Sequence, residues 1–332
     1  MSAATGTAPS NQWLSMAGWR TMLRDRPLIP LTLLLLVLVV IVEIAQAGTV
    51  KPNWIGVIVR ASVPLAILAG CQTLTMLTGG IDLSVGYVAS MSGFVVATFV
   101  HQPGGWPLGV VVALTAAAVA GLISGIGVGV FRVHPLIMTL GMGLIVYGFA
   151  NVWQLQMVQT GAGVPADLRN LFTGLWADVV PFNLVAFIPI AVVLILGLRR
   201  TGYGRMLYAV GDNPIAARLS GVRSWQVLIA LYVISAVLAG IAGLIVSGLS
   251  NTASVTLVQS LLLPSVAAAV IGGTSILGGR GGYSGTMIGA LILTVLTALL
   301  TIVGLPEPWR QIVFGSIVVL VAAAYTRVTA ES

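Results

Sequence analysis

A lone aspartate, Asp82, lies in an otherwise uncharged and strongly apolar part of the chain, within the segment LTGGIDLSVG at 77–86. The two glycines of this segment break a helix, and Ser84 is suited to cap the helix that follows. A carboxyl group at membrane depth costs about 2.5–3.5 kcal/mol on insertion scales, so such residues are usually functional. The segment therefore predicts either a helix break beside a path for a polar solute, or a turn at the membrane surface in which Asp82 caps the next helix.

Other polar side chains near this break could hydrogen-bond a solute that passes it. A path of this kind needs hydrogen-bonding and apolar faces rather than a tight charged site. The residues that we expect along the path are Gln72, Thr75, Thr78, Asp82 and Ser84, with Asn251 and Ser254 at its outer mouth.

A second candidate site lies in the segment 199–225, the longest markedly polar stretch of the chain. It contains five of the fifteen basic residues and only one acid, Asp212. Within it, Asn213 is a favourable N-cap, Pro214 suits the first position of a helix, and Gly221 stands where a helix can end. The sequence therefore predicts a short capped helix over 213–221.

This short helix carries its apolar side chains on one face. Ile215, Ala216, Leu219 and Val222 are spaced at i, i+1, i+4 and i+7, and Arg218 lies off that face. Arginines alone would be explained by anchoring of a helix end at the lipid surface. Anchoring does not explain a capped helix with an apolar face, so the pattern favours a surface that docks onto a partner protein.

A third motif, IGGTSILGGRGGYSGTMIGALIL at 271–293, resembles the first in its Gly-Gly pair, small polar residue and further glycine. The similarity suggests two related halves of the chain, joined near 158–180. If both motifs lie on one side of the membrane, the repeat is parallel rather than inverted. The motif is not a nucleotide-binding loop, because the chain contains no Gly-Lys-Ser/Thr. A tight turn between closely packed helices is favoured over direct contact with a solute.

Enzyme chemistry finds little support in the sequence. His101 and His134 lie in turns near prolines, and no carboxylate is close to either in sequence. No His-Glu-x-x-His, Gly-x-Ser-x-Gly or paired-acid spacing occurs. The single cysteine, Cys71, lies in an apolar run, so the chain has neither an internal disulfide framework nor a cysteine-rich metal site. We therefore expect no catalytic residue, no metal and no cofactor in this chain.

The bulk composition indicates an integral membrane protein. Of 332 residues, 58% are hydrophobic and only 7% are charged, and the mean hydropathy is +1.07. Soluble domains are about a quarter charged. The apolar runs are long and continuous rather than alternating, which favours helices over a barrel. The net charge of +7 reflects basic residues gathered in loops and does not indicate nucleic-acid binding.

Charge-free runs predict an all-α, polytopic membrane protein with about ten transmembrane helices. We expect an N-terminal tail at 1–27, a single transmembrane domain at 28–326 that includes the loop 199–225, and a C-terminal tail at 327–332. The predicted spans are 28–47, 54–78, 84–101, 108–131, 135–157, 181–198, 226–249, 261–279, 284–304 and 309–326.

The distribution of basic residues predicts the orientation of these spans. If the loop 199–225 is cytoplasmic, alternation also places both termini and the turns at Arg132 and Arg280 on the cytoplasmic side. The outer side then keeps little positive charge, and it includes the stretch 158–180 and the turn with Glu307.

Two alternatives to this topology are open. The apolar run 28–42 follows several arginines and precedes Ala45-Gln46-Ala47, a pattern that also suits a cleaved signal peptide. An uncleaved first helix is favoured because the rest of the chain is membrane-embedded as well. An eight-span arrangement would require two of the weaker segments to be re-entrant.

Three segments together resemble the permease subunits of bacterial ABC sugar importers. They are TGGIDLSVG at 78–86, YAVGDNPIAARLSGV at 208–222 and IGGTSILGGRGG at 271–282, and the resemblance covers most of the chain. The nearest group is the ribose, xylose, arabinose and galactose type, with branched-chain amino-acid permeases more distant. In this family, Gly-x-Asn-x-x-Ala-Ala-x-x-x-Gly is the cytoplasmic element that couples to the ATPase. This motif is matched here by Gly211, Asn213, Ala216, Ala217 and Gly221. With Pro214 and Leu219 of the same short helix, these are the residues that we expect to couple to the ATPase.

The same resemblance implies the fold, location and partners of the protein. It implies the ABC importer permease fold, a multi-pass position in the bacterial inner (plasma) membrane, and uptake of a monosaccharide. The implied partners are an ATP-binding subunit that carries ATP and Mg, a periplasmic sugar-binding protein and a second permease copy in a homodimer.

Other kinds of transporter are rivals to this interpretation. A branched-chain amino-acid or nucleoside permease would have the same architecture. An ion-coupled secondary transporter would need buried carboxylates in several helices, whereas only Glu43 and Asp82 qualify. The sequence does not distinguish one sugar from another.

Overall fold

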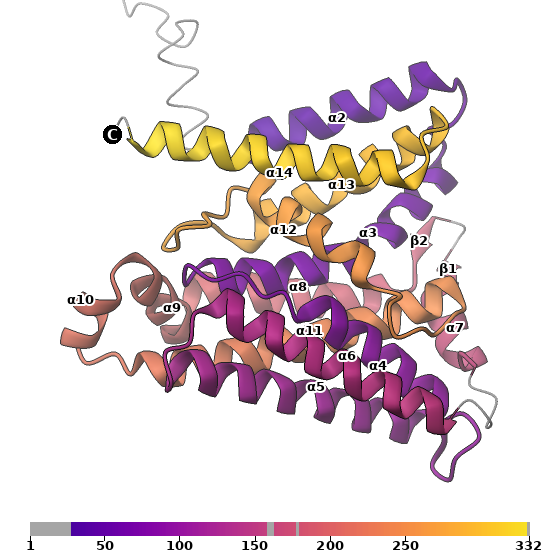
Figure 1. Ribbon diagram of the computed structural model, residues 1–332. Coiled ribbons are helices and arrows are strands. Elements are labelled where there is room, and N and C mark those ends of the chain that lie inside the picture. Colours follow the sequence, from indigo (N-terminus) through magenta and orange to yellow (C-terminus); the bar gives the residue numbers. More distant parts are fainter. Residues whose placement is uncertain (1–27, 158–162, 177–178, 331–332) are drawn as a thin grey trace, which may run out of the picture.

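Helices make up nearly all of the structure, a computed structural model that describes residues 28–157, 163–176 and 179–330 (Figure 1). This confirms the all-α expectation. The strands of the described residues are the two-residue β1 (Leu175–Trp176) and β2 (Val180–Pro181), which pair antiparallel. The helices are α2 (Leu28–Ala45), α3 (Pro52–Met76), α4 (Val85–Thr98), α5 (Gly105–Gly129), α6 (Pro135–Met157), α7 (Ala166–Thr173), α8 (Leu184–Arg200), α9 (Gly202–Asp212), α10 (Pro214–Leu219), α11 (Ser224–Ser250), η3 (Gln259–Leu261), α12 (Leu262–Ile271), α13 (Tyr283–Ile302) and α14 (Glu307–Ala330).

The long helix α11 is the centre of the bundle and packs against α3, α4 and α5. Small residues let its backbone come close to these neighbours. A Cβ added at Gly243 of α11 would overlap the carbonyl oxygen of Ala89 in α4. One added at Gly121 of α5 would overlap the carbonyl oxygen of Tyr232 in α11. Because burial of apolar surface gives little drive between helices in lipid, this close packing holds the core together.

Each of the ten predicted spans overlaps a helix, but the helices differ in length. Within the described residues, six helices are long and apolar enough to cross a membrane, namely α2, α3, α5, α6, α11 and α13. The pair α8 and α9, bent by 67°, would make a seventh. The 14 residues of α4 span only about 21 Å, against about 30 Å of hydrocarbon, and α12 is shorter still. The count of ten stays a prediction, and α4 and α12 are the segments that an eight-span arrangement would make re-entrant.

The connections between the helices gather at two ends of the bundle (Figure 1). One end, called the α10 end below, holds α9, α10, the α5–α6 turn, the start of α2 and the end of α14. The opposite end, called the α7 end, holds α7, β1, β2 and the α2–α3, α4–α5 and α13–α14 connections. The segments that the charge distribution assigns to the same side of the membrane therefore lie at the same end of the bundle.

The polar stretch 158–180 contains a short helix, α7, that the sequence analysis did not predict. Leu168 and Phe172 are its buried side chains, and α7 packs against α11. The guanidinium of Arg60 in α3 donates a hydrogen bond to the carbonyl oxygen of Thr173, at the last turn of α7. A cation at this position offsets the partial negative charge of a helix C-terminus. Arg60 therefore holds the C-terminus of α7 against α3.

Adding one methyl group at Gly243 should destabilise the bundle, because α4 and α11 would have to move apart. Overpacking of this kind costs about 1–3 kcal/mol. We expect Gly243→Ala to lower the Tm of the detergent-solubilised protein, measured by fluorescence-detected gel filtration after heating. The control is Gly148→Ala, where an added Cβ meets nothing within 4 Å. Equal Tm values for the two variants would contradict the packing described.

Candidate functional site

Helix α10 is capped at both ends by the residues that the sequence indicates. Asn213 Oδ1 accepts hydrogen bonds from the backbone N–H groups of Ile215 and Ala216, each at 3.0 Å. Pro214 occupies the first turn, where its missing N–H costs nothing. Gly221 has φ +84° and ends the helix in the left-handed conformation. The predicted helix and both of its caps are confirmed.

The apolar face of α10 points away from the bundle. Ala217 is the buried residue of the helix, whereas Ile215 is 63% exposed and Leu219 is 85% exposed. Figure 1 shows α10 projecting from its end of the molecule. The predicted apolar stripe is therefore not part of the core, apart from the half-buried Val222. A projecting helix that exposes large apolar side chains is typical of an interaction surface.

The end of α9, directly before α10, touches two distant segments through backbone atoms. A Cβ at Gly211 would overlap the carbonyl oxygen of Leu77 and lie 2.8 Å from the backbone nitrogen of Gly279. That nitrogen donates a hydrogen bond to the Leu77 carbonyl oxygen at 3.0 Å. A Cβ at Gly278 would lie 2.7 Å from the Gly211 carbonyl oxygen and 3.1 Å from the nitrogen of Gly79. We call Gly79, Gly211, Gly278 and Gly279 the glycine junction.

The glycine junction joins all three motifs that the sequence analysis singled out. The break after α3 contributes Gly79, the end of α9 contributes Gly211, and the break after α12 contributes Gly278 and Gly279. The hydroxyl of Tyr208 in α9 adds a hydrogen bond to the Gly281 carbonyl oxygen at 2.8 Å. Only residues without a side chain permit such close backbone contact. Only Asp212 and Asn213 therefore separate α10 from a backbone contact with both breaks.

The two breaks begin with the same backbone geometry. After α3, the N–H of Gly79 donates to Met76 at 2.9 Å and the N–H of Gly80 donates to Thr75 at 3.0 Å. After α12, Gly273 donates to Val270 at 2.9 Å and Thr274 donates to Ala269 at 3.0 Å. Both are Schellman caps with a left-handed glycine. The sequence similarity of the two motifs thus has a structural counterpart, and both breaks meet the end of α9, so α3 and α12 run toward the same end.

The carboxyl group of Asp82 is buried inside the protein, with 1% of the residue exposed. Oδ1 accepts hydrogen bonds from the N–H of Ser84 at 2.9 Å and from its hydroxyl at 2.6 Å. Oδ2 accepts one from the hydroxyl of Ser235 in α11 at 3.3 Å. Asp82 therefore fixes the entry of α4 and ties it to the central helix. Of the two arrangements predicted from the sequence, this is the one in which Asp82 caps the start of the next helix. The capping carboxylate is buried in the protein interior rather than exposed at the surface.

The expectation that Ser84 caps α4 was wrong. Ser84 occupies the N-cap position but its side chain makes no capping hydrogen bond. Its hydroxyl donates to Asp82 instead. A carboxylate two residues earlier is the stronger acceptor, so it takes both the hydroxyl and the N–H of Ser84.

Side chains from neighbouring helices complete the backbone hydrogen bonds of this break. The amide of Gln72 donates to the Asp82 carbonyl oxygen at 2.8 Å and accepts from the Asp82 N–H at 3.2 Å. The hydroxyl of Thr139 in α6 donates to the Ile81 carbonyl oxygen at 3.2 Å and accepts from the Leu83 N–H at 3.1 Å. Irregular backbone at membrane depth is tolerated only when its polar groups are satisfied in this way.

The remaining residues expected along a solute path are not all at one place. Thr75 is fully buried and its hydroxyl bonds to carbonyl groups of its own helix. Thr78 does the same at the start of the break. Asn251 is exposed at the end of α11, with φ +52°, and Ser254 follows it. The structure thus gathers Gln72, Asp82 and Ser84 into one network and places Asn251 and Ser254 apart from it.

The sequence analysis missed residues that complete this site. Thr139 and Ser235 come from helices far away in sequence, and a hydroxyl on an apolar helix carries no distinctive signal. Within the described residues, no three His, Cys, Asp or Glu side chains are close enough to share a metal ion.

An apolar helix bundle with a satisfied polar break and a projecting helix at one end is the architecture of a polytopic membrane protein. The chain belongs to the family described as branched-chain amino acid transport system / permease component, whose model matches residues 54–322.

Curated relatives of the chain are import permeases. It is 33% identical to the fructose import permease protein of Rhizobium meliloti over 266 residues, covering 78% of this chain and 74% of the relative. It is 34% identical to the ribose import permease protein of Escherichia coli over 295 residues, covering 84% and 89%. It is 30% identical to the galactose/methyl galactoside import permease protein of Haemophilus influenzae over 287 residues, covering 82% and 85%. No solved structure matches the chain significantly.

Replacing Gln72 by leucine should destabilise the protein, because it leaves the buried N–H and carbonyl of Asp82 without partners. Each such group costs about 1–3 kcal/mol. We expect a clear drop in the Tm of the detergent-solubilised protein, whereas Gln226→Leu, at an exposed position, should leave the Tm near that of the wild type. A Gln72→Leu protein as stable as the wild type would contradict the bracing of the break.

Proposed function

We propose that this chain is the membrane-spanning subunit of an ATP-binding-cassette importer that takes up a monosaccharide. The observation that carries the proposal is the projecting, capped and apolar α10, joined by the glycine junction to both helix breaks. The relatives named for fructose, ribose and galactose import support a sugar as the substrate.

In this proposal, α10 docks into a groove of a separate ATP-binding subunit. That subunit binds ATP and Mg and performs the hydrolysis, so this chain has no catalytic residue of its own. Gly211, Asn213, Pro214, Ala216, Ala217, Leu219 and Gly221 form the coupling element.

Movement of α10 reaches the membrane-embedded breaks because α9 cannot slide past them. Gly211 is already in backbone contact with Leu77 and Gly279, so a displacement of α9 pushes on both breaks together. The solute path borders the break at 77–84, where Gln72, Thr75, Thr78, Asp82 and Ser84 keep the backbone in shape. Asn251 and Ser254 stand at the outer mouth.

The other partners and the location follow from the same proposal. The α10 end faces the cytoplasm of a bacterium, together with both tails, 1–27 and 327–332. Basic residues support this orientation, because six arginines lie between 199 and 280 around α9, α10 and the second break. A periplasmic sugar-binding protein docks at the α7 end, and a second permease copy completes the path.

A branched-chain amino-acid importer is the second candidate, because the description of the family names that substrate. An ion-coupled transporter is disfavoured by Glu43, one of the two carboxylates it would need. Glu43 accepts hydrogen bonds from the N–H groups of Gly48 and Val50 at 2.7 and 2.8 Å, so it braces the α2–α3 turn. Uptake of ribose, fructose and galactose, compared with leucine and uridine, separates the candidates in cells that express the complete transporter.

Leu219→Ser should weaken binding of the ATP-binding subunit, because Leu219 contributes the most exposed apolar side chain of α10. Burying a leucine is worth about 1.5–3 kcal/mol, which corresponds to roughly a 10- to 100-fold change in Kd. Co-purification and coupled ATP hydrolysis measure the effect. The matched control is Phe131→Ser, a 74% exposed residue in the α5–α6 turn at the same end. Equal losses in both variants would contradict a specific role of α10.

Gly211→Ala should uncouple transport without removing the partner. The added Cβ overlaps the Leu77 carbonyl oxygen and forces α9 away from the breaks, while the surface of α10 is unchanged. We expect the ATP-binding subunit to co-purify normally and sugar uptake to fall at least about tenfold, the effect of a 1.4 kcal/mol change. Gly202→Ala, on the same helix with only ordinary contacts, is the control. Normal uptake by Gly211→Ala would contradict coupling through the junction.

A further inference from the structure

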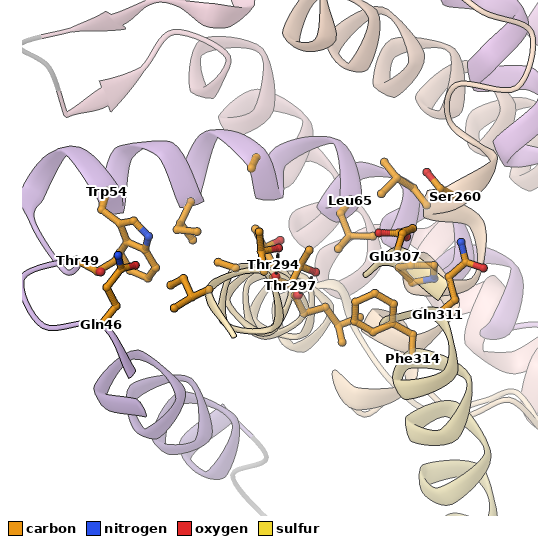
Figure 2. Close-up of a pocket in the computed structure, with 18 residues that line it drawn as sticks. Gln46, Thr49, Trp54, Leu65, Ser260, Thr294, Thr297, Glu307, Gln311 and Phe314 are labelled. Carbon is orange, nitrogen blue, oxygen red and sulfur yellow. Dashed lines mark hydrogen bonds between the residues drawn. The ribbon is translucent and has the colours of Figure 1, made fainter. Parts of the chain in front are cut away.

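A large pocket (Figure 2) is lined by the α2–α3 connection and the start of α14, which lie at the α7 end of the bundle (Figure 1). Its volume is about 770 Å³, within the range of about 300–1,000 Å³ that is usual for small-molecule sites. The walls come from the α2–α3 connection, α3, η3, α12, α13 and the first turns of α14. Most of the lining is apolar, and it includes Ile58, Leu65, Leu293 and Phe314.

One wall of the pocket carries a ladder of hydroxyl groups. Thr294, Thr297 and Thr301 lie at i, i+3 and i+7 on α13 and all line the pocket. Their hydroxyls donate to carbonyl oxygens four residues earlier, at 2.7–2.8 Å. Each hydroxyl hydrogen is therefore engaged. The oxygens of Thr294 and Thr297 keep lone pairs that can accept from a ligand, whereas the Thr301 oxygen already accepts one hydrogen bond from Arg310. Figure 2 shows Thr294 and Thr297 between the side chains of α3 and those of α14.

The other polar groups of the pocket stand around this ladder. Gln46 and Thr49 come from the α2–α3 connection, Gln311 from α14 and Ser260 from η3, with the indole of Trp54 on α3. Amides supply donors and acceptors, and an indole presents a flat apolar face with one N–H. A ligand held here would meet hydroxyl and amide groups around its edge and apolar groups on its faces.

The one carboxylate of the pocket is already neutralised. Glu307 Oε2 lies 3.1 Å from Nη2 of Arg310, and Nη1 of Arg310 donates to the Thr301 hydroxyl at 3.0 Å. An amino acid would need an unpaired charge for its ammonium group and another for its carboxylate. A neutral molecule with several hydroxyls and C–H faces fits the lining better.

We propose that this pocket binds a monosaccharide, as a site at the outer end of the permease. The inference rests on the proposed function for its substrate class and direction of transport, but the site itself is additional to the coupling helix and the polar break. The pocket holds the sugar by the α13 hydroxyls and the α2–α3 and α14 amides, with Trp54 against a C–H face.

The test uses the full transporter in cells and a cysteine placed in the pocket. Ala61→Cys introduces the reactive thiol at an exposed residue that lines the pocket and has no hydroxyl of its own. The native Cys71 is fully buried, so it gives little background. Spheroplasts are treated with a membrane-impermeant methanethiosulfonate reagent, with and without D-ribose, D-fructose or D-galactose. A sugar that occupies the pocket should slow labelling at least about fivefold at saturation, because the thiol of a sugar-bound transporter is shielded from the reagent. Thr252→Cys, exposed at the loop after α11, should label at the same rate throughout.

Each outcome of the labelling separates this site from the proposed function. If the wild type takes up one of the three sugars and that sugar does not slow labelling of Ala61→Cys, the pocket proposal is overturned and the proposed function stands. If leucine or uridine is taken up and none of the three sugars is, the proposed function fails and the site fails with it. Equal protection of Thr252→Cys would show a global change and also overturn the site.

A second variant separates a binding role from a structural one. Thr297→Val keeps the shape of the side chain and removes the hydroxyl, so the uptake rate should fall several-fold, while Thr297→Ser restores most of it. A valine variant that transports as fast as the wild type would overturn the role of the hydroxyl ladder.

Discussion

The close backbone contact at the glycine junction is the constraint on which the rest of the structure depends. The end of α9 touches the breaks after α3 and α12 without any side chain between them, so the three segments cannot move independently. Side chains can change rotamer and absorb a small displacement, whereas main-chain contacts transmit it. The junction thus makes one mechanical unit of a projecting helix and two helix breaks that are about 65 to 200 residues apart in sequence.

The polar break at 77–84 is built to withstand such a displacement. The side chains of Gln72 and Thr139 each hydrogen-bond to one backbone N–H and one backbone carbonyl of the break. The carboxylate of Asp82 links the start of α4 to α11. In lipid these groups would be very costly if left unpaired, so the break holds one defined shape. Rigid parts around a shared contact are what a lever mechanism requires. The apolar face of α10 supplies the place at which a partner would push.

The sequence predicted the local features of this protein better than its contacts. The cap at Asn213, the end at Gly221 and the apolar face of α10 depend on neighbours within one turn, and the structure agrees with each. The ten apolar segments overlap helices, but their number of crossings depends on the lengths of α4 and α12, which composition does not determine. The partners Thr139 and Ser235, the brace at Arg60 and the meeting of Gly211 with Gly279 depend on packing between distant helices, so no local pattern could indicate them.

A matched pair of glycine variants tests the central claim most directly. Gly278 and Gly273 both have left-handed backbones, with φ +95° and +86°, so an alanine is strained to a similar extent at either position. A Cβ at Gly278 would lie 2.7 Å from the Gly211 carbonyl oxygen, whereas a Cβ at Gly273 would meet nothing within 4 Å. If the junction couples α9 to the breaks, Gly278→Ala should lose sugar uptake in the reconstituted transporter, while Gly273→Ala should keep most of it. Equal uptake by the two variants would contradict the account.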